Sequence, residues 1–253
     1  MRRNSKILQH RAALEVGFSV PDTLYPNDPR EIRAFLQRHR RVVYKPLFTQ
    51  AWTVGETTLA SATTLLSEEM VEDDEVLQAM PGVFQALTEK AWELRVTVLG
   101  RRTLTARVLS QQTEEGRLDW RRAYGELVLE PTELPTEVAE RCFELLDRLG
   151  LIFGCFDFIV TPEGEHVFLE VNQAGQFLFV EEATGQPLLD AFTELLIQGR
   201  EDFRWREDRP DVRFADVRDR AQERLREMSE GHVRAPSPAV QEEEAPVEES
   251  VAE

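Results

Sequence analysis

The 253-residue sequence has little of what extracellular frameworks, zinc sites and membrane spans require. It holds two isolated cysteines without CxxC spacing and four histidines, so disulfide frameworks and thiolate zinc sites lack support, and we expect both cysteines in the core. The longest apolar run, around Leu149 to Val160, is broken by Gly150, Gly154 and Asp157 and is far shorter than the roughly 20 residues of a membrane helix. The N-terminus leads into a helical pattern and not into an apolar signal core. These absences predict a cytoplasmic protein with no membrane partner.

Positive charge is also scarce. Lysine and arginine number 30 against 47 aspartate and glutamate residues, which gives a formal net charge of −17. A protein that binds a polyanion needs a basic surface, so we expect no nucleic-acid partner. Residues 229–253 contain seven glutamates and one arginine, and this acidic, Pro-containing segment predicts a disordered tail.

The composition, with 42% apolar and 30% charged residues, allows a sizeable core, and the hydrophobic periodicity predicts an α+β protein. Residues 50–74 carry a weak pattern, which we interpret as one or two strands, a mobile loop around Gly55 and a short helix. Thr136 is expected to cap a helix that Gly150 ends. The remaining helices are predicted over residues 3–15, from Pro29 onward, 187–198 and 212–228, and the strands over 42–46, three within 83–110, and a hairpin of 153–161 with 166–172.

The hairpin carries the strongest chemical signal. If its turn closes symmetrically on Glu163-Gly164, Asp157 lies opposite Glu170. The same register places Asn172 on the face of Glu170. Opposed carboxylates destabilise a sheet unless something offsets their repulsion. Two interpretations remain open at this point: an all-oxygen site for Mg²⁺, or a solvated acidic face.

Weaker signals lie earlier in the chain. Lys45 ends a short apolar strand, as a phosphate-binding cation would, although a surface lysine gives the same pattern. Glu93 and Arg95 share one strand face, which suits phosphate or metal binding and equally a surface ion pair. Residues 83–87 could offer strand-edge backbone groups to a purine.

Considered together, these segments resemble the ATP-grasp ligases, and more closely the graspetide (microviridin-type) ribosomal peptide maturases. The most specific phrase is Phe-Leu-Glu-Val-Asn-x-x-Gly-Gln-Phe over residues 168–177, followed by Glu-Glu-Ala-Thr-Gly over 181–185. The resemblance covers roughly residues 4–200. Its other segments, in chain order, are Lys45-Pro46-Leu47, Phe84-Gln85-Ala86-Leu87 with Lys90, Glu93 to Gly100, Asp119-Trp120-Arg121, and Asp157-Phe158.

The resemblance implies an α+β ATP-grasp fold in which two lobes enclose an ATP cleft. The implied lobes are residues 1–88 and 89–204, followed by the amphipathic helix at 205–228 and the tail at 229–253. Relatives begin with an additional pre-ATP-grasp domain, which this chain is expected to lack. Gln173-Ala174 stands where the family often has Pro-Asn, a change we expect to be tolerated.

The same resemblance implies ATP and Mg²⁺ as cofactors. It assigns Lys45, Lys90 and Glu93 to ATP, with Gln85, Ala86 and Leu87 at the adenine. It assigns Arg95, Arg121 and Asp119 to catalysis, and Asp157, Glu170 and Asn172 to the metal. The implied reaction activates a peptide carboxylate as an acyl phosphate, which a hydroxyl or amine in the same peptide attacks to close an ester or amide macrocycle.

The implied partner is a ribosomal precursor peptide, and homologues suggest a homodimer. Two other functions remain open. One is a carboxylate–amine ligase of the glutathione-synthetase-like type. The other is a truncated, non-catalytic nucleotide- or peptide-binding module that assists a full-length partner.

Overall fold

The computed structural model describes residues 5–25, 27–47, 51–54, 57–60, 63–79, 81–123, 125–205 and 211–230. The chain divides into two compact units, Met1–Phe214 and Ala215–Glu253. The loop expected around Gly55 and most of the expected tail lie outside the described residues. The predicted boundary between two lobes within the first unit stays a prediction.

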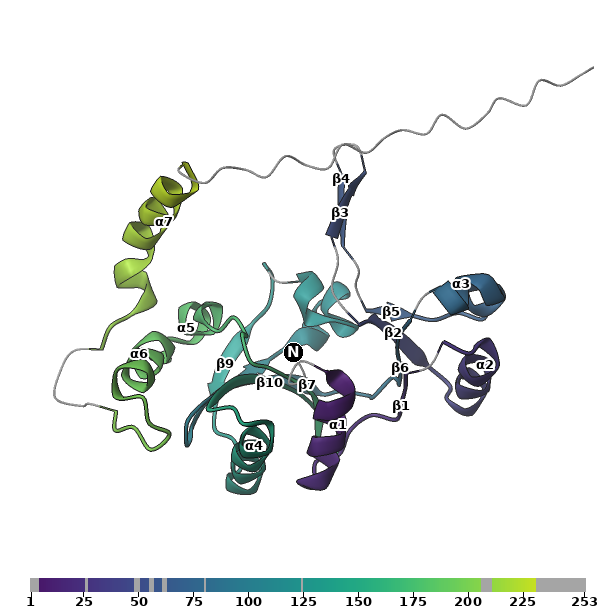
Figure 1. Ribbon diagram of the computed structural model, residues 1–253, viewed down its shortest axis with the longest axis horizontal. Helices are drawn as coiled ribbons and strands as arrows, with labels where there is room; N and C mark the ends of the chain where they lie inside the picture. Colours follow the sequence, from purple (N-terminus) through teal and green to yellow (C-terminus); the bar gives the residue numbers. More distant parts are fainter. Residues whose placement is uncertain are drawn as a thin grey trace, which may run out of the picture. The chain divides into compact units, whose positions relative to one another are not determined.

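The smaller of the two main sheets has four strands in the order β1-β6-β2-β5 (Figure 1). Helices α2 and α3 pack beside it, and Ile32, Phe35 and Phe84 form the centre of its core. Helix α2 begins where the sequence indicates, because the Asp28 side chain accepts a hydrogen bond from Arg30 N ahead of Pro29 in the first turn. The elements are β1 (Thr23–Leu24), α2 (Pro29–Arg38), β2 (Val42–Pro46), β5 (Thr64–Leu65), η2 (Glu69–Val71), α3 (Asp74–Ala79) and β6 (Gly82–Ala86).

The larger sheet has five antiparallel strands in the order β11-β10-β7-β8-β9. Helices α1 and α4 lie on the same side of it (Figure 1) and bury its apolar face, so Val96, Phe156 and Phe158 lie in the main core. Since side chains alternate along a strand, Glu93, Arg95 and Asp157 lie on the other face, where Leu99 and Ala106 pack in separate hydrophobic clusters. The elements are α1 (Lys6–Glu15), β7 (Trp92–Leu99), β8 (Arg102–Val108), β9 (Leu129–Thr132), α4 (Thr136–Leu149), β10 (Phe153–Val160) and β11 (His166–Asn172).

The remaining elements include the small β3–β4 hairpin and several short helices. The hairpin, at residues where one or two strands were predicted, forms a two-stranded sheet of its own. Both cysteines are buried, as predicted. The elements are β3 (Ala51–Val54), β4 (Thr57–Ala60), η3 (Ser110–Gln112), η4 (Glu115–Arg117), η5 (Trp120–Ala123), α5 (Leu178–Thr184), α6 (Leu188–Gln198) and, beginning at the boundary of the two units, α7 (Phe214–Glu230).

One predicted helix cap is wrong. Thr136 is the first residue of α4 and makes no capping hydrogen bond, because Pro135 occupies the N-cap position and its carbonyl accepts from Val138 N and Ala139 N. The other end is as predicted, since Gly150 adopts a left-handed conformation with φ +61°.

The register of the β10–β11 hairpin matches the prediction at the site and differs at the turn. The turn holds three residues, because Thr161 N donates to Glu165 O, so the symmetric closure on Glu163-Gly164 is wrong. A bulge between the Asp157 and Phe158 pairs leaves Leu169 as one extra residue in β11. The bulge restores the predicted pairing of Asp157 with Glu170 and of Cys155 with Asn172.

Candidate active site

Two adjoining cavities lie where the polar face of the five-stranded sheet meets the four-stranded sheet. Both are lined by Lys45, Thr63 and Glu93. One continues toward the end of β6 and its following loop, and the other toward η5 and β11. The second cavity gathers six of the charged side chains that the sequence indicated, namely Lys45, Glu93, Asp119, Arg121, Asp157 and Glu170.

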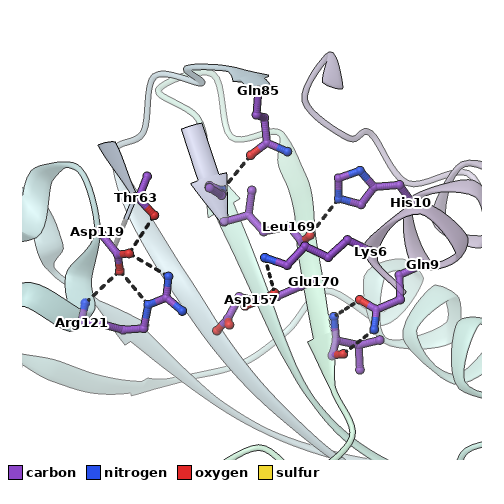
Figure 2. A network of polar contacts seen from close by, with 12 residues as sticks. Lys6, Gln9, His10, Thr63, Gln85, Asp119, Arg121, Asp157, Leu169 and Glu170 are labelled. Atoms are coloured by element: carbon purple, nitrogen blue, oxygen red, sulfur yellow. Dashed lines mark hydrogen bonds and ion pairs between the residues drawn. The ribbon is translucent and has the colours of Figure 1, made fainter. Parts of the chain in front are cut away.

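Asp157 and Glu170 occupy opposed positions on neighbouring strands and line the same cavity (Figure 2). Their positions follow from strand alternation, because the flanking Phe156, Phe158 and Val171 enter the core on the opposite face. Burial raises the pKa of Asp157, and the Glu170 charge raises it further while Arg95 opposes the shift. Two partly buried carboxylates at opposed positions favour a bound cation.

Each carboxylate is held by a cation of the protein. Arg95 Nη1 donates to both oxygens of Asp157, at 2.9 and 3.0 Å. Lys6 Nζ, from helix α1, lies 3.0 Å from Glu170 Oε2. Burial opposes ionisation of Glu170, yet Lys6, Arg121 and Lys45 together lower its pKa. Glu170 is therefore an anion facing three cations.

Lys45 reaches the cavities from strand β2 of the other sheet. Its Nζ donates to Gln85 Oε1 at 2.7 Å, and Gln85 Nε2 in turn donates to Thr23 Oγ1 at 3.1 Å. Burial, with the Lys6 charge adding to it, lowers the pKa of Lys45 to about 8. A lysine desolvated in this way gains most from an anionic ligand, because the ligand replaces the lost hydration.

Asp119 and Arg121 form a rigid pair at the start of η5. The Asp119 carboxylate accepts from Arg121 N, Nε and Nη2 at 3.2, 2.8 and 2.7 Å, and from Thr63 Oγ1 at 2.9 Å (Figure 2). Burial would raise its pKa, but these hydrogen bonds lower it to about 2. The Arg121 side chain is 54% exposed, so its guanidinium is held in place while open to a ligand.

Another buried ion pair joins Lys90, in the loop after β6, to Glu93 on β7, with Lys90 Nζ 2.9 Å from Glu93 Oε1. Burial raises the pKa of Glu93, and its Oε2 has no hydrogen-bond partner. Ala86 and Leu87 line the neighbouring cavity, but their backbone N–H groups already donate to Asp22 O and Arg41 O. Among the described residues, Glu93 Oε2 is thus a buried acceptor without a hydrogen-bond partner in this part of the site.

Arg95 also fixes the loop that follows β11. Its Nη2 donates to Gln176 O at 2.8 Å, and Cys155 Sγ donates to Gly175 O at 3.5 Å. A Cβ at Gly175 would lie 2.6 Å from Cys155 Cβ and 3.0 Å from Arg95 Nη2, so this position admits only glycine without displacement. Asn172 lies at the entry of the loop, where its Oδ1 accepts from Ala174 N at 3.0 Å.

Lys6, Thr63 and Gln9 were not assigned to the site by the sequence analysis. Lys6 contacts Glu170, Thr63 donates to Asp119, and Gln9 binds the backbone of β11. Lys6 and Gln9 carry one available signal, since polar side chains three residues apart share a face of α1. Thr63 carries none, because it lies in an irregular segment whose pattern predicts no partner.

The oxygen donors of the site suit a hard cation whose remaining ligands come from the substrate. Among the described residues, no group of three or more His, Cys, Asp or Glu side chains is arranged to hold a metal ion. Mg²⁺ typically binds one or two carboxylates plus substrate phosphates, and Asp157 and Glu170 supply two opposed carboxylates. The residues therefore fit Mg²⁺ in the presence of a phosphate ligand.

Comparison with known proteins decides the fold. No family model and no curated protein matches the chain. Among solved structures, the chain is similar to a RiPP-associated ATP-grasp ligase from Chryseobacterium gregarium, which was solved in complex with ADP and a leader and core peptide. The two sequences are 33% identical, and the structures superpose with a TM-score of 0.74. The match covers 80% of this chain and 62% of that one. The chain has the ATP-grasp fold. The resemblance that the sequence indicated is thereby confirmed.

Two further solved structures, both from Microcystis aeruginosa MRC, extend the likeness. The macrocyclase MdnC, bound with precursor peptide MdnA, is 32% identical with a TM-score of 0.70, over 78% of this chain and 62% of that one. The macrocyclase MdnB is 32% identical with a TM-score of 0.62, over 78% and 60%. The present ATP-grasp chain therefore spans less than two thirds of the length of these ligases. No helix in the described ranges is long and apolar enough to cross a membrane.

Proposed function

We propose that this chain is the ATP-grasp part of an ADP-forming ligase that joins side chains within a ribosomal precursor peptide. The observation that carries the proposal is the placement of Asp157 opposite Glu170, in a cavity that Lys45 and Arg121 also line. Such a cavity suits a metal–triphosphate ligand, because the carboxylates can bind the metal ion and the cations can bind the phosphates. The likeness to RiPP-associated ligases and macrocyclases supports the peptide as substrate.

The cations of the site would bind and orient the phosphates of ATP. Lys45 is held by Gln85, and Arg121 is held by Asp119, so both present charge with little loss of side-chain entropy on binding. Lys90 would contribute a third charge near the end of β6, and Glu93 an acceptor for a nucleotide donor group. Gln85, Ala86 and Leu87 would border the adenine.

Asp157, Glu170 and Asn172 would hold Mg²⁺. The ion, when bound, neutralises phosphate charge and so lowers the barrier to phosphoryl transfer. Arg95 fixes Asp157 through both oxygens, and Lys6 fixes Glu170, so these side chains need no reorganisation before metal binding.

The proposed reaction has two steps. An Asp or Glu carboxylate of the peptide attacks the γ-phosphate, which gives an acyl phosphate and ADP. A Ser or Thr hydroxyl, or a Lys amine, then attacks the acyl carbon and displaces inorganic phosphate, which closes an ester or amide ring. Arg121 and Arg95 would stabilise the negative charge of the transferring group, and positioning supplies most of the remaining catalysis.

The direct test is the mass of a precursor peptide after incubation with the chain, ATP and Mg²⁺. The expected result is the loss of one water and the release of one ADP for each bond formed, with both absent in Glu170→Gln and retained in the matched variant Glu165→Gln. A gain of mass when a free amino acid is supplied would instead indicate a carboxylate–amine ligase. An unchanged mass with the precursor encoded beside the gene would contradict the proposal.

A further inference from the structure

Strand β11 forms one edge of the five-stranded sheet, and its outer edge is covered by side chains of helix α1. Gln9 Nε2 donates to Val171 O at 2.8 Å, and Gln9 Oε1 accepts from Val171 N at 3.1 Å. Gln9 is 3% exposed. The Gln9 amide therefore supplies, at Val171, the two hydrogen bonds that a neighbouring strand would make.

His10 makes the next contact along the same edge. Its Nε2 lies 3.0 Å from Leu169 O, and its Nδ1 lies 2.8 Å from Tyr25 Oη. Because a carbonyl can only accept, Nε2 carries the proton and Nδ1 accepts from the tyrosine hydroxyl. Burial lowers the pKa of His10, which keeps the ring in this neutral form.

A third contact comes from the chain that follows α1. Phe168 N donates to Ser19 O at 2.8 Å, in an isolated parallel bridge between Ser19 and Val167. The three contacts thus fall on residues 168, 169 and 171. They bracket Glu170 on both sides.

The bracketed segment is the place where β11 carries its extra residue. Without the bulge at Leu169, the pairing set by the turn would bring Leu169 opposite Asp157. A shift of one residue turns every side chain to the other face, so Glu170 would point into the apolar core. The contacts from α1 hold the backbone of the bulge in the arrangement that keeps Glu170 in the cavity.

One face of α1 serves this purpose, since Lys6, Gln9 and His10 lie three and four residues apart. Lys6 contacts Glu170 itself, whereas Gln9 and His10 contact only the backbone beside it (Figure 2). We propose that Gln9 and His10 are positioning residues, which hold the β11 bulge so that Glu170 faces the metal and nucleotide site. This inference rests on the proposed function.

The chain offers a matched control for Gln9. Gln198, at the end of α6, makes the same pair of hydrogen bonds with a backbone: its Nε2 donates to Arg204 O at 2.7 Å, and its Oε1 accepts from Arg204 N at 3.0 Å. Gln9→Met and Gln198→Met both remove a pair of hydrogen bonds to one backbone residue at similar side-chain length. Gln198→Met also removes the hydrogen bond from Nε2 to Glu194 Oε2 at 2.7 Å, and only Gln9 borders the site.

The test is a titration of the purified chain with Mn²⁺ at saturating ADP, followed by the electron paramagnetic resonance signal of free Mn²⁺. The Mn²⁺ binding that is lost in Glu170→Gln is taken as binding at the proposed site. We expect Gln9→Met to raise the Mn²⁺ concentration for half-saturation of this part about 10-fold, as loss of a supporting partner does in metal sites. Gln198→Met is expected to bind as the wild type does. Should Gln9→Met fail to fold, Tyr25→Phe removes the support of His10 and is expected to shift half-saturation in the same direction.

The outcomes separate the two proposals. Equal half-saturation in wild type, Gln9→Met and Tyr25→Phe, with binding lost in Glu170→Gln, overturns the positioning role and leaves the proposed function intact. An equal shift in Gln9→Met and Gln198→Met also overturns it, because the effect would then be one of general stability. A wild-type chain without Glu170-dependent Mn²⁺ binding overturns the proposed function itself.

Discussion

Arg95 Nη1 donates to both carboxylate oxygens of Asp157, while Nη2 of the same guanidinium donates to the carbonyl of Gln176. One side chain thereby joins strands β7 and β10 to the loop after β11. Arg95 is 5% exposed, so these hydrogen bonds form away from water. A planar guanidinium can make this set of contacts, and an ammonium cannot.

Arg95→Lys is therefore expected to keep the charge and lose the tether to the loop. We predict a fall in the free energy of unfolding of about 2 kcal/mol, because the buried Asp157 would keep a cation but lose its paired geometry. Urea unfolding measures this. The control is Arg101→Lys at an exposed arginine bound to Asp147 and Glu201, which should cost less than about 1 kcal/mol. Equal losses in both variants would contradict the structural role of Arg95.

Lys45 gives the nucleotide affinity a pH dependence. Its pKa is lowered to about 8 by burial, so it loses its charge as pH rises through that value, and a bound phosphate favours the charged form. We predict that the affinity for ADP is constant below about pH 7 and falls by up to about 10-fold per pH unit above about pH 8. Lys45→Arg stays charged and should show no such fall. Calorimetric titrations at several pH values measure both, and parallel profiles would exclude Lys45 as the titrating group.

The ionised Asp119 carboxylate should stabilise the fold at every pH above the range in which it titrates. Its pKa is lowered to about 2 from the usual 3.8, so its contribution to stability is fully present above about pH 4 and is lost as pH falls through about 2. Asp119→Asn is expected to cost about 2 kcal/mol of unfolding free energy near neutral pH. The difference from wild type should shrink as pH is lowered from about 4. Urea unfolding at each pH measures it, and a difference that does not change with pH would show that the Asp119 charge plays no part.

Gly175 is a packing constraint that a methyl group would test. Its Cβ would lie 2.6 Å from Cys155 Cβ and 2.8 Å from Sγ, so Gly175→Ala must displace the loop. We expect a loss of about 1–3 kcal/mol in unfolding free energy, as for other overpacked sites. Gly125, where an added Cβ would have nothing within 4 Å, is the control. Similar losses for Gly125→Ala would refute the steric explanation.

The fold and much of the site follow from local sequence features. Alternation in β10 and β11 separates Phe156 and Phe158 from Asp157, and the structure places them on the predicted faces. The site also gathers Lys45, Asp119 and Arg121 around the same cavity as Glu170. The catalytic, nucleotide and metal roles of the predicted residues stay predictions.

The remaining features depend on contacts between distant parts of the chain. The pairing of Asp157 with Glu170 was predicted from a two-residue turn, but a three-residue turn and the bulge at Leu169 produce it together. The bulge is supported by Gln9, which is 162 residues away from Val171 in sequence. No local periodicity reports such a contact, and for the same reason Lys6 was missed.

The most direct test of the central claim is a calorimetric titration of the purified chain with ATP, with and without Mg²⁺. Glu170→Gln is compared with Glu165→Gln, which changes a glutamate next to the turn of the same hairpin whose carboxylate accepts from Ser19. We expect Mg²⁺ to strengthen ATP binding in wild type and Glu165→Gln, and this effect to be lost in Glu170→Gln. ATP binding with the same Mg²⁺ dependence in all three proteins would contradict the account.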